Sequence, residues 1–503
     1  MDAEITKKPN GWAITNLEDI VEILDSHRIP LNSSERVLRK GSYPYYGANG
    51  QVDTIDNYIF DGDFALLAED GGYFDDPSRP VAYHVSGKFW ANNHVHILKP
   101  LGLIPAQFLI QNLNHADLMP FVGGTTRLKL NQAAMRKIPL LLPPLNEQIR
   151  IVARIEELQA RNCRAREALE TVPDLLDQLR QSILAAAFRG DLTKEWRERN
   201  PNVEPATELL KRIRAERRKR WEESELEKLK VKGLSEDKLQ EAFAIRLKQY
   251  KEPSPVDATE LPELPEGWCW VNLDVIKEYS IYGPRFSNEA YSQRGTIILR
   301  TTDIDSYGKV DTVNAPRIDL SNIEKEKYIV KKGDLLITRT GSIGTLTVFN
   351  DDVETIPGAF LLHYRLAWDA SLSWLIFHQL KSPRCQHAMT GGSAGTGRPN
   401  LNAPTLEAIP LALPPVDEQA IILNRIDSHL QTIGMLRDRL RNLLYKNDRL
   451  DQSILTKAFR GELVPQDPND ESASALLERI KQEKVRAIVK PKIKDKRNMG
   501  AHP

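Results

Sequence analysis

Cysteine and long apolar runs are scarce in this chain of 503 residues. Its three cysteines are widely spaced, and none belongs to a CxxC motif. This argues against structural disulfides and a zinc site, and it favours a reducing compartment. No run approaches the roughly 20 apolar residues of a membrane span, and the N-terminus lacks the apolar core of a signal peptide. We therefore expect a soluble, cytoplasmic protein without membrane contact.

Net charge is absent too, because 69 Lys and Arg residues balance 69 Asp and Glu residues. Neutrality neither demands nor excludes a polyanionic partner, so only local charge bears on nucleic-acid binding. A hydrophobic content of 41% suffices for packed domains. The chain is too long for one ordinary core and should divide into several domains.

Catalytic signatures are missing as well. The chain has no GxxxxGK[ST] phosphate loop, no HExxH and no GxSxG motif, and the glycine-rich stretch 391–400 lacks the lysine that would hold phosphate. His94 and His96 would share one face of a strand and could bind a metal only with a third ligand. No third ligand is identifiable, which favours structural or DNA-facing histidines. We predict no catalytic residue and no metal site in this chain.

A duplication dominates what is present. Residues 138–148, IPLLLPPLNEQ, return at 409–419 as IPLALPPVDEQ, an offset of 271 residues. At the same offset QSILAAAFRG (181–190) returns as QSILTKAFRG (452–461). A shared offset over this length indicates two copies of one structural unit. The stretches in front of each copy are rich in Gly, Asn, Tyr and short β-branched runs. They predict two mixed α+β domains that differ strongly in sequence.

Each copy continues into a long helix. Asn146 is a good N-cap, and apolar positions then alternate at spacings of four and three as far as Ala186, a heptad seam of about five repeats that the second copy repeats. Two such helices in one chain should pair with each other. Pro173 should kink or break the first helix. The charged stretch 211–232 predicts either a solvated helix with mixed charges or a nucleic-acid contact, and acidic residues 222–227 favour the former.

Two domains held apart by paired helices suit a bipartite target such as double-stranded DNA. A helix from Asn146 to Phe188 spans about 60 Å, enough to hold two readers over DNA half-sites that lie about one helical turn apart. Polar side chains in the loops are candidates for contacts with bases, although most protein contacts with DNA go to the backbone. The candidates are Tyr45, Asn49, Arg79, Lys88, Asn92, Asn93, His94, Arg127 and Lys129 in the first domain, and Tyr282, Arg285, Arg300, Arg339, Arg398 and Asn400 in the second.

These motifs together resemble the DNA specificity subunit of type I restriction-modification systems. The resemblance rests on residues 43–50, 58–72 and 89–98, the two LPPxxEQ strings and the two strings ending in AFRG. It implies an α+β chain with two mixed α/β target recognition domains and two helices that form an antiparallel coiled coil, related by a pseudo-twofold repeat. It also implies that the helices set the spacer between half-sites and dock two methylation subunits, which restriction subunits then join. S-adenosylmethionine, ATP and magnesium would then belong to partner subunits.

The boundaries follow from the repeat. We assign 1–140 to the first recognition domain, 141–195 to the first helical region, 196–260 to a charged helical linker, 261–411 to the second recognition domain, 412–465 to the second helical region and 466–503 to a short helix with a basic, disordered tail. Two alternatives stay open: a self-sufficient DNA methyltransferase or nuclease, and a structural coiled-coil adaptor.

Overall fold

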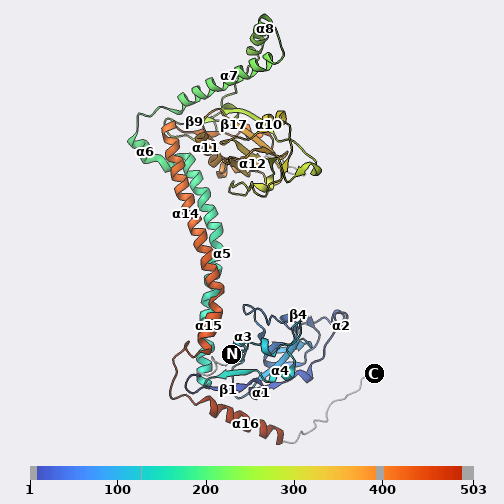
Figure 1. Ribbon diagram of the computed structural model, residues 1–503. Helices are drawn as coiled ribbons and strands as arrows, with labels where there is room; N and C mark the ends of the chain where they lie inside the picture. The colour runs from blue at the N-terminus through green and yellow to red at the C-terminus, as the bar shows by residue number, and fades with distance from the viewer. Residues whose placement is uncertain (1–7, 126, 392–400, 490–503) are drawn as a thin grey trace. The chain divides into compact units, whose positions relative to one another are not determined.

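The structure is a computed structural model that describes residues 8–125, 127–391 and 401–489. The basic tail after residue 489 and the candidates Arg398 and Asn400 lie outside these residues. The chain divides into two compact units, unit 1 with residues 1–171 and 439–503, and unit 2 with residues 172–438. Figure 1 shows the chain coloured by residue number from the N-terminus to the C-terminus. None of the helices in the described ranges is long and apolar enough to cross a membrane.

Domain 1, our name for residues 13–142 of unit 1, begins and ends in one two-stranded sheet, in which β1 (Ala13–Asn16) pairs antiparallel with β8 (Pro139–Leu142). Between them lies a six-stranded sheet in the order β2-β7-β5-β6-β3-β4, antiparallel except for the parallel pair β3 and β6. Its elements are α1 (Leu17–Ile20), β2 (Val21–Ile23), η1 (Asp25–His27), α2 (Ser33–Leu38), β3 (Tyr43–Gly47), β4 (Gly50–Ile55), β5 (Phe60–Ala68), β6 (Ala82–Ala91), β7 (Val95–Pro100), α3 (Ala106–His115), η2 (Met119–Phe121) and α4 (Gln132–Arg136).

Domain 2, our name for residues 269–413 of unit 2, is closed in the same way by β9 (Cys269–Val271) and β18 (Leu411–Leu413). It contains two four-stranded sheets, ordered β10-β17-β14-β15 and β11-β13-β12-β16. Its other elements are α9 (Leu273–Ile276), β10 (Lys277–Tyr282), η4 (Asn288–Ala290), β11 (Tyr291–Ser292), β12 (Thr296–Leu299), η5 (Thr301–Asp303), β13 (Arg317–Ile318), α10 (Asn322–Tyr328), β14 (Leu335–Thr338), β15 (Leu346–Val348), β16 (Thr355–Pro357), β17 (Leu361–Leu366), α11 (Ala370–Leu380), α12 (Pro383–Gly391) and α13 (Ala403–Glu407).

The central strand of each domain is buried on both faces. In β5, Ala65 and Leu67 belong to one hydrophobic cluster and Leu66 to another. In β14, Leu335 joins the main cluster of unit 2 and Leu336 joins a separate one. Successive side chains of a strand point to opposite faces, so an uninterrupted apolar run is what a doubly covered strand requires.

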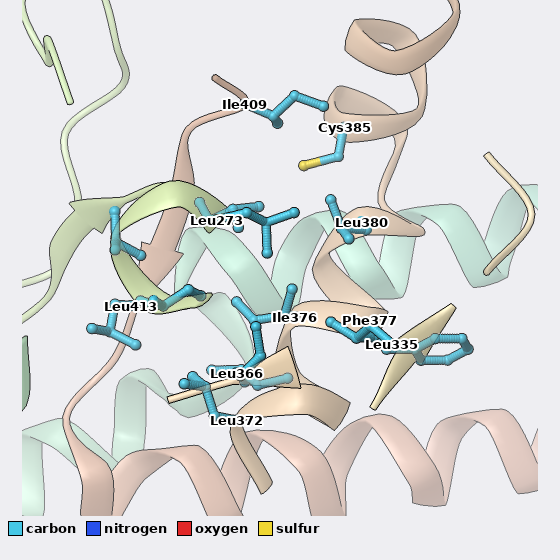
Figure 2. Close-up of a cluster of buried hydrophobic side chains, with 14 of the residues drawn as sticks. Leu273, Leu335, Leu366, Leu372, Ile376, Phe377, Leu380, Cys385, Ile409 and Leu413 are labelled. Atoms are coloured by element: carbon cyan, nitrogen blue, oxygen red, sulfur yellow. The ribbon is translucent and has the colours of Figure 1, made fainter. Parts of the chain in front are cut away.

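The cores of the domains continue onto the long helices. Figure 2 shows part of the unit 2 cluster, where Leu372, Ile376 and Leu380 of α11 gather with strand residues such as Leu335 and Leu413. Residues at the end of α5 (Leu145–Arg189) and at the start of α14 (Val416–Asp448) join the same cluster: Leu184, Phe188, Ile422 and Ile426. In unit 1, Ile151 and Ile155 of α5 and Phe459 of α15 (Leu450–Phe459) join the core of domain 1.

The long helices depart from expectation in two places. Helix α5 runs unbroken through Pro173, so of the predicted kink or break the break is wrong, and the kink stays a prediction. Pro173 is exposed, which leaves water able to bond the carbonyl that its missing N–H would have served. The second helix, which the heptad pattern predicted to be continuous, ends at Asp448 and resumes at Leu450.

The predicted seam is only half buried. On α5 the buried positions Ile155, Asn162, Leu176 and Ile183 fall at multiples of seven residues, and on α14 Ile426, Ile433 and Leu440 do the same. Other seam positions are exposed, namely Leu179 on α5, Leu436 and Leu443 on α14, and Leu450 on α15, whereas Ile151 and Ile422 are buried in the domain cores. Apolar residues thus occur at the predicted spacing, but only part of the predicted seam is buried.

A matching joint connects each domain to its helices. The Trp12 indole donates to Glu147 Oε2 at 3.0 Å in unit 1, and the Trp268 indole donates to Glu418 Oε2 at 2.7 Å in unit 2. A further helix docks beside each joint: α16 (Ala473–Val489) through Ala473 N to Gly11 O, and α7 (Ala206–Lys230) through Ala206 N to Gly267 O, both at 2.8 Å. Each unit therefore has an equivalent joint, and the two joints carry different domains.

The charged linker, residues 196–260, is mostly helical. It contains the end of α6 (Lys194–Arg199), α7 and α8 (Glu236–Leu247), and it follows η3 (Asp191–Thr193). Its charges pair along the helix, as between Arg218 and Glu222 at 2.9 Å. Trp221 of α7 packs on Tyr250, just after α8, with 4.9 Å between ring centroids. The charges are therefore mixed and paired as the sequence favoured, while Ile213 of α7 is buried in the unit 2 core and Arg220 pairs with Glu278 of domain 2.

Candidate nucleic-acid interface

In domain 1, candidate residues from separate loops converge where β5 ends. Asn49, in the turn between β3 and β4, donates its amide N–H to Gly71 O at 3.0 Å. His94, in the turn before β7, has Nδ1 2.6 Å from Asp70 Oδ1. Arg127, in the loop before α4, donates to the same carboxylate oxygen at 2.7 Å.

Lys129 completes this group, which we call the β5-end cluster: Asn49, Glu69, Asp70, His94, Arg127 and Lys129. The Lys129 ammonium lies 3.1 Å from Glu69 Oε1. Backbone bonds fix the loops, because Lys129 N donates to Gly123 O at 2.8 Å and Leu130 N donates to Glu69 O at 2.7 Å. The side chains of Arg127 and Lys129 remain more than half exposed. The cluster therefore presents cations and an amide on one surface, held from behind by carboxylates.

A buried ion network lies beneath the cluster. His96 on β7 has Nδ1 2.6 Å from Asp25 Oδ2 and Nε2 2.8 Å from Leu130 O. Because a carbonyl oxygen only accepts, Nε2 carries a hydrogen. Burial alone would raise the pKa of Asp25, but its bonds with His96 and the nearby Arg28 keep that pKa below the ordinary value. The network ties η1 and β7 to the loop that carries Arg127.

The two histidines do not share a strand face as the sequence suggested, since His94 precedes β7. Asp25, Glu69 and His96 are close enough together to hold a metal ion. However, Arg28 NH1 already donates to Glu69 at 2.8 Å, and Arg28 NH2 lies 3.6 Å from Asp25. A fixed guanidinium thus supplies the positive charge, and we interpret the group as an ion network.

The prediction that Tyr45 lies at the surface is wrong. Its side chain is fully buried, and its hydroxyl accepts from Leu31 N at 3.2 Å. The alternation of β3 turns this ring into a cluster with Ile55 and Trp90, away from solvent. A string of Tyr, Pro and Gly is typical of a surface loop, but residues 43–47 form a strand.

The other domain 1 candidates are at the surface. Arg79 is exposed with its guanidinium 3.5 Å from the Tyr73 ring centroid, and the exposed Lys88 lies over Tyr58 at 4.6 Å. Asn92 Oδ1 accepts from His94 N at 2.8 Å, and the neighbouring Asn93 is exposed. Asn92 thus fixes the turn that carries His94, whereas Arg79 and Lys88 pack on tyrosine rings. Their contact with DNA stays a prediction.

In domain 2, two candidates come together. The Arg339 guanidinium lies 4.6 Å from the ring centroid of Tyr282, and the Tyr282 hydroxyl accepts from Ala403 N at 3.3 Å. Arg285 is exposed in the loop after β10. Arg300 follows β12 and borders a hollow of about 480 Å³ with Tyr291, Gln293, Asn314 and Arg317. These four neighbours were not among the predicted site residues, and neither were Asp70 and Asp303, which pair with Arg127 and Arg300. The only sequence signal for the two carboxylates is an acidic residue shortly after a strand.

The family is decided by comparison with known proteins. The family described as "Type I restriction modification DNA specificity domain" matches residues 9–170 and 265–445. The chain belongs to this family. The resemblance drawn from the sequence is therefore confirmed, and the chain carries two recognition domains of mixed α/β structure.

Relatives and solved structures match over nearly the full length. The type I restriction enzyme EcoDI specificity subunit of Escherichia coli is 24% identical over 491 residues, covering 95% of this chain and 96% of that protein. The EcoKI specificity subunit of Escherichia coli K12 is 24% identical over 515 residues, with coverages of 95% and 97%. The HsdS subunit from Thermoanaerobacter tengcongensis shares the fold, with a TM-score of 0.52 at 18% identity, covering 91% of this chain and 98% of that one. Specificity subunits are not the catalytic parts of restriction enzymes, so the enzyme alternative is not favoured.

Proposed function

We propose that this chain is the DNA specificity subunit of a type I restriction-modification complex, in which each recognition domain reads one half of a bipartite double-stranded target. The observation that carries the proposal is the repeated joint. Trp12 with Glu147 and Trp268 with Glu418 hold two domains whose sheets differ in order. Two equivalent joints that carry different domains suit a complex that must recognise two different half-sites.

In this proposal the helices form an antiparallel coiled coil that fixes the spacer. Within unit 1, Asn162 donates to Asp451 at 3.0 Å and Arg166 donates to Asp448 at 2.8 Å. Within unit 2, Arg437 donates to Asp177 at 2.6 Å, and Leu176 and Ile183 pack with Ile433. In each unit the residue numbers rise along α5 as they fall along the partner, which supports an antiparallel pair.

A heptad deletion tests the spacer. Removing residues 167–173 and 438–444 takes one heptad from each helix and shortens the pair by about 10 Å. Because DNA rises about 3.4 Å per base pair, we expect the gap between the half-sites to shorten by about three base pairs. Both half-sites should be retained. The measurement is sequencing of methylated adenines in cells that carry the variant and its methylation subunits.

Removing seven residues from the exposed linker stretch 254–260 is the matched control and should leave the gap unchanged. An unaltered gap in the heptad variant would show that the helices do not set it.

We also propose that the uncovered half of the seam docks two methylation subunits, which restriction subunits then join. Leu179 and Leu436 in unit 2 are 45% and 42% exposed, and Leu443 and Leu450 in unit 1 are similarly open. Apolar side chains at regular heptad positions suit a partner helix. S-adenosylmethionine, ATP and magnesium would be bound by those partners, and a cytoplasmic location follows from the DNA target.

Leu436→Glu tests this docking surface. Burying one leucine at an interface contributes about 1.5 to 3 kcal/mol, so we expect the affinity for the methylation subunit to fall about tenfold or more. Isothermal titration with the purified subunit measures it. Gln431→Glu adds the same charge at another exposed position of α14 and should leave the affinity unchanged. Equal effects of the two substitutions would rule out the seam as the contact.

A further inference from the structure

Each domain contains an exposed arginine whose guanidinium is paired with a largely buried carboxylate. In domain 1 the Arg127 side chain is 63% exposed and that of Asp70 is 14% exposed, with NH2 2.7 Å from Oδ1. In domain 2 the corresponding values are 45% for Arg300 and 6% for Asp303, also at 2.7 Å. Both carboxylates lie where the chain leaves a strand, after β5 and after β12.

Other arginine pairs in the described parts of the domains are built differently. Arg365 and Asp334 are both buried, at 18% and 3% exposed, as suits an internal support. Arg39 and Asp56 are both open, at 34% and 47%, which is the kind of surface pair that contributes little to stability. A pair of an exposed guanidinium and a largely buried carboxylate fits neither an internal support nor an ordinary surface pair. Its exposed N–H groups can instead bind a ligand.

The pairing with the carboxylate leaves some of the guanidinium N–H donors available. A guanidinium has five N–H donors. Asp303 takes Nε–H at 3.0 Å and one hydrogen of NH2 at 2.7 Å, which leaves the two NH1 hydrogens and one on NH2 for a ligand. The O6 and N7 acceptors of guanine in the major groove need two parallel donors, and the end of a guanidinium supplies them.

The carboxylates themselves are fixed. Asp303 Oδ2 also accepts from Arg300 N at 2.8 Å, and Asp70 Oδ1 lies 2.6 Å from His94 Nδ1. A guanidinium held in this way loses less rotational freedom on binding, so it directs its donors without further ordering cost.

Charge favours bases over phosphates at these positions. A phosphate contact depends on net positive charge, which a carboxylate within 3 Å largely cancels. A base edge is neutral and needs directed donors, which the same carboxylate supplies by holding the guanidinium in place. The pairing therefore weakens the arginine as a phosphate ligand and improves it as a reader of bases.

We infer that Arg127 and Arg300 each read a guanine, one in each half-site, and that Asp70 and Asp303 are the positioning residues that aim them. The inference rests on the proposed function and deepens it, because it assigns a base and a reader to each half of the target. Four substitutions test it in the complex of full-length chain and methylation subunits: Arg127→Lys, Arg300→Lys, Asp70→Asn and Asp303→Asn.

The measurement is the adenine methylation rate, together with the binding affinity, on duplexes that carry each base at every position of the target. Lysine keeps the charge and loses the paired donors. We expect Arg127→Lys and Asp70→Asn to reduce the preference for guanine at one position of one half-site by about tenfold. Arg300→Lys and Asp303→Asn should do the same in the other half-site. The lysine variants keep both carboxylates, so they test the idea even where Asp303→Asn unfolds the loop.

The controls are Asp56→Asn and Asp352→Asn, which break exposed pairs with Arg39 and Lys332 and should change no base preference. The inference is overturned if the lysine variants keep every preference, or if they lower binding equally on all duplexes, as loss of a phosphate contact would. It is also overturned if the control variants relax the same positions. A wild-type complex with no base preference anywhere would instead contradict the proposed function itself.

Discussion

A chain whose residues 13–142 are replaced by the equivalent domain of a relative will recognise a target with one new half-site and one old one. The cut points follow from the fold, because Ala13 pairs with Leu142 in the sheet that closes domain 1. The two cut points therefore lie side by side, and the Trp12–Glu147 joint is left intact. The new half-site should be that of the donor, at full preference.

The exchange has a built-in control. Replacing residues 269–413 cuts at the equivalent sheet, where Cys269 pairs with Leu413, and should change only the other half-site. The donor must preserve the packing of His115 and Phe108 on Phe459, which lies outside the exchanged segment. Methylated-adenine sequencing gives both targets. If either exchange left both half-sites unchanged, the chain would be a structural adaptor.

Glu418→Ala will strongly destabilise unit 2. The Glu418 side chain is fully buried and accepts from Arg197 NH1 at 2.6 Å and from the Trp268 indole at 2.7 Å. Removing it leaves a buried indole N–H without its acceptor and a largely buried guanidinium without its carboxylate, and Arg197 then keeps its bonds to Thr193 Oγ1 and Gly190 O. Breaking a buried pair in this way costs about 3 kcal/mol or more. Thermal unfolding measures the loss, and amide exchange at residues 206–213, next to the joint, locates it.

Glu147→Gln is the contrasting case in unit 1. Glu147 is buried and accepts from Trp12, but no arginine donates to it among the described contacts. Burial raises its pKa. The folded state therefore binds this proton more readily than the unfolded state, and unit 1 gains stability as the pH falls through the raised pKa. Glutamine should keep the indole bond, leave stability within about 1 kcal/mol at neutral pH and remove that pH dependence. A loss as large as that of Glu418→Ala would contradict this difference.

The repeat could be predicted from sequence because it rests on short, specific strings. The offset of 271 residues placed Glu147 and Glu418 at equivalent positions before any contact was known. The heptad spacing was also readable, but not which positions the partner helix covers. Leu436 and Leu440 are both apolar seam residues, yet only Leu440 is buried, because coverage depends on the neighbouring helix and not on the periodicity.

The candidate site was harder to predict, because residue type does not determine which way a strand faces. Tyr45 and Asn49 lie four residues apart in one string, and one is in the core while the other is at the surface. The pairing of Asp70 with Arg127 joins residues 57 apart in sequence and depends on how β5 meets the loop before α4. Such contacts follow from the tertiary fold alone.

The most direct test of the central claim is single-molecule sequencing of methylated adenines in cells that carry the intact chain with its methylation subunits. The account predicts one split, asymmetric motif, with two specified halves separated by a gap of fixed length. A continuous motif, two identical halves, or a gap that varies from site to site would contradict it.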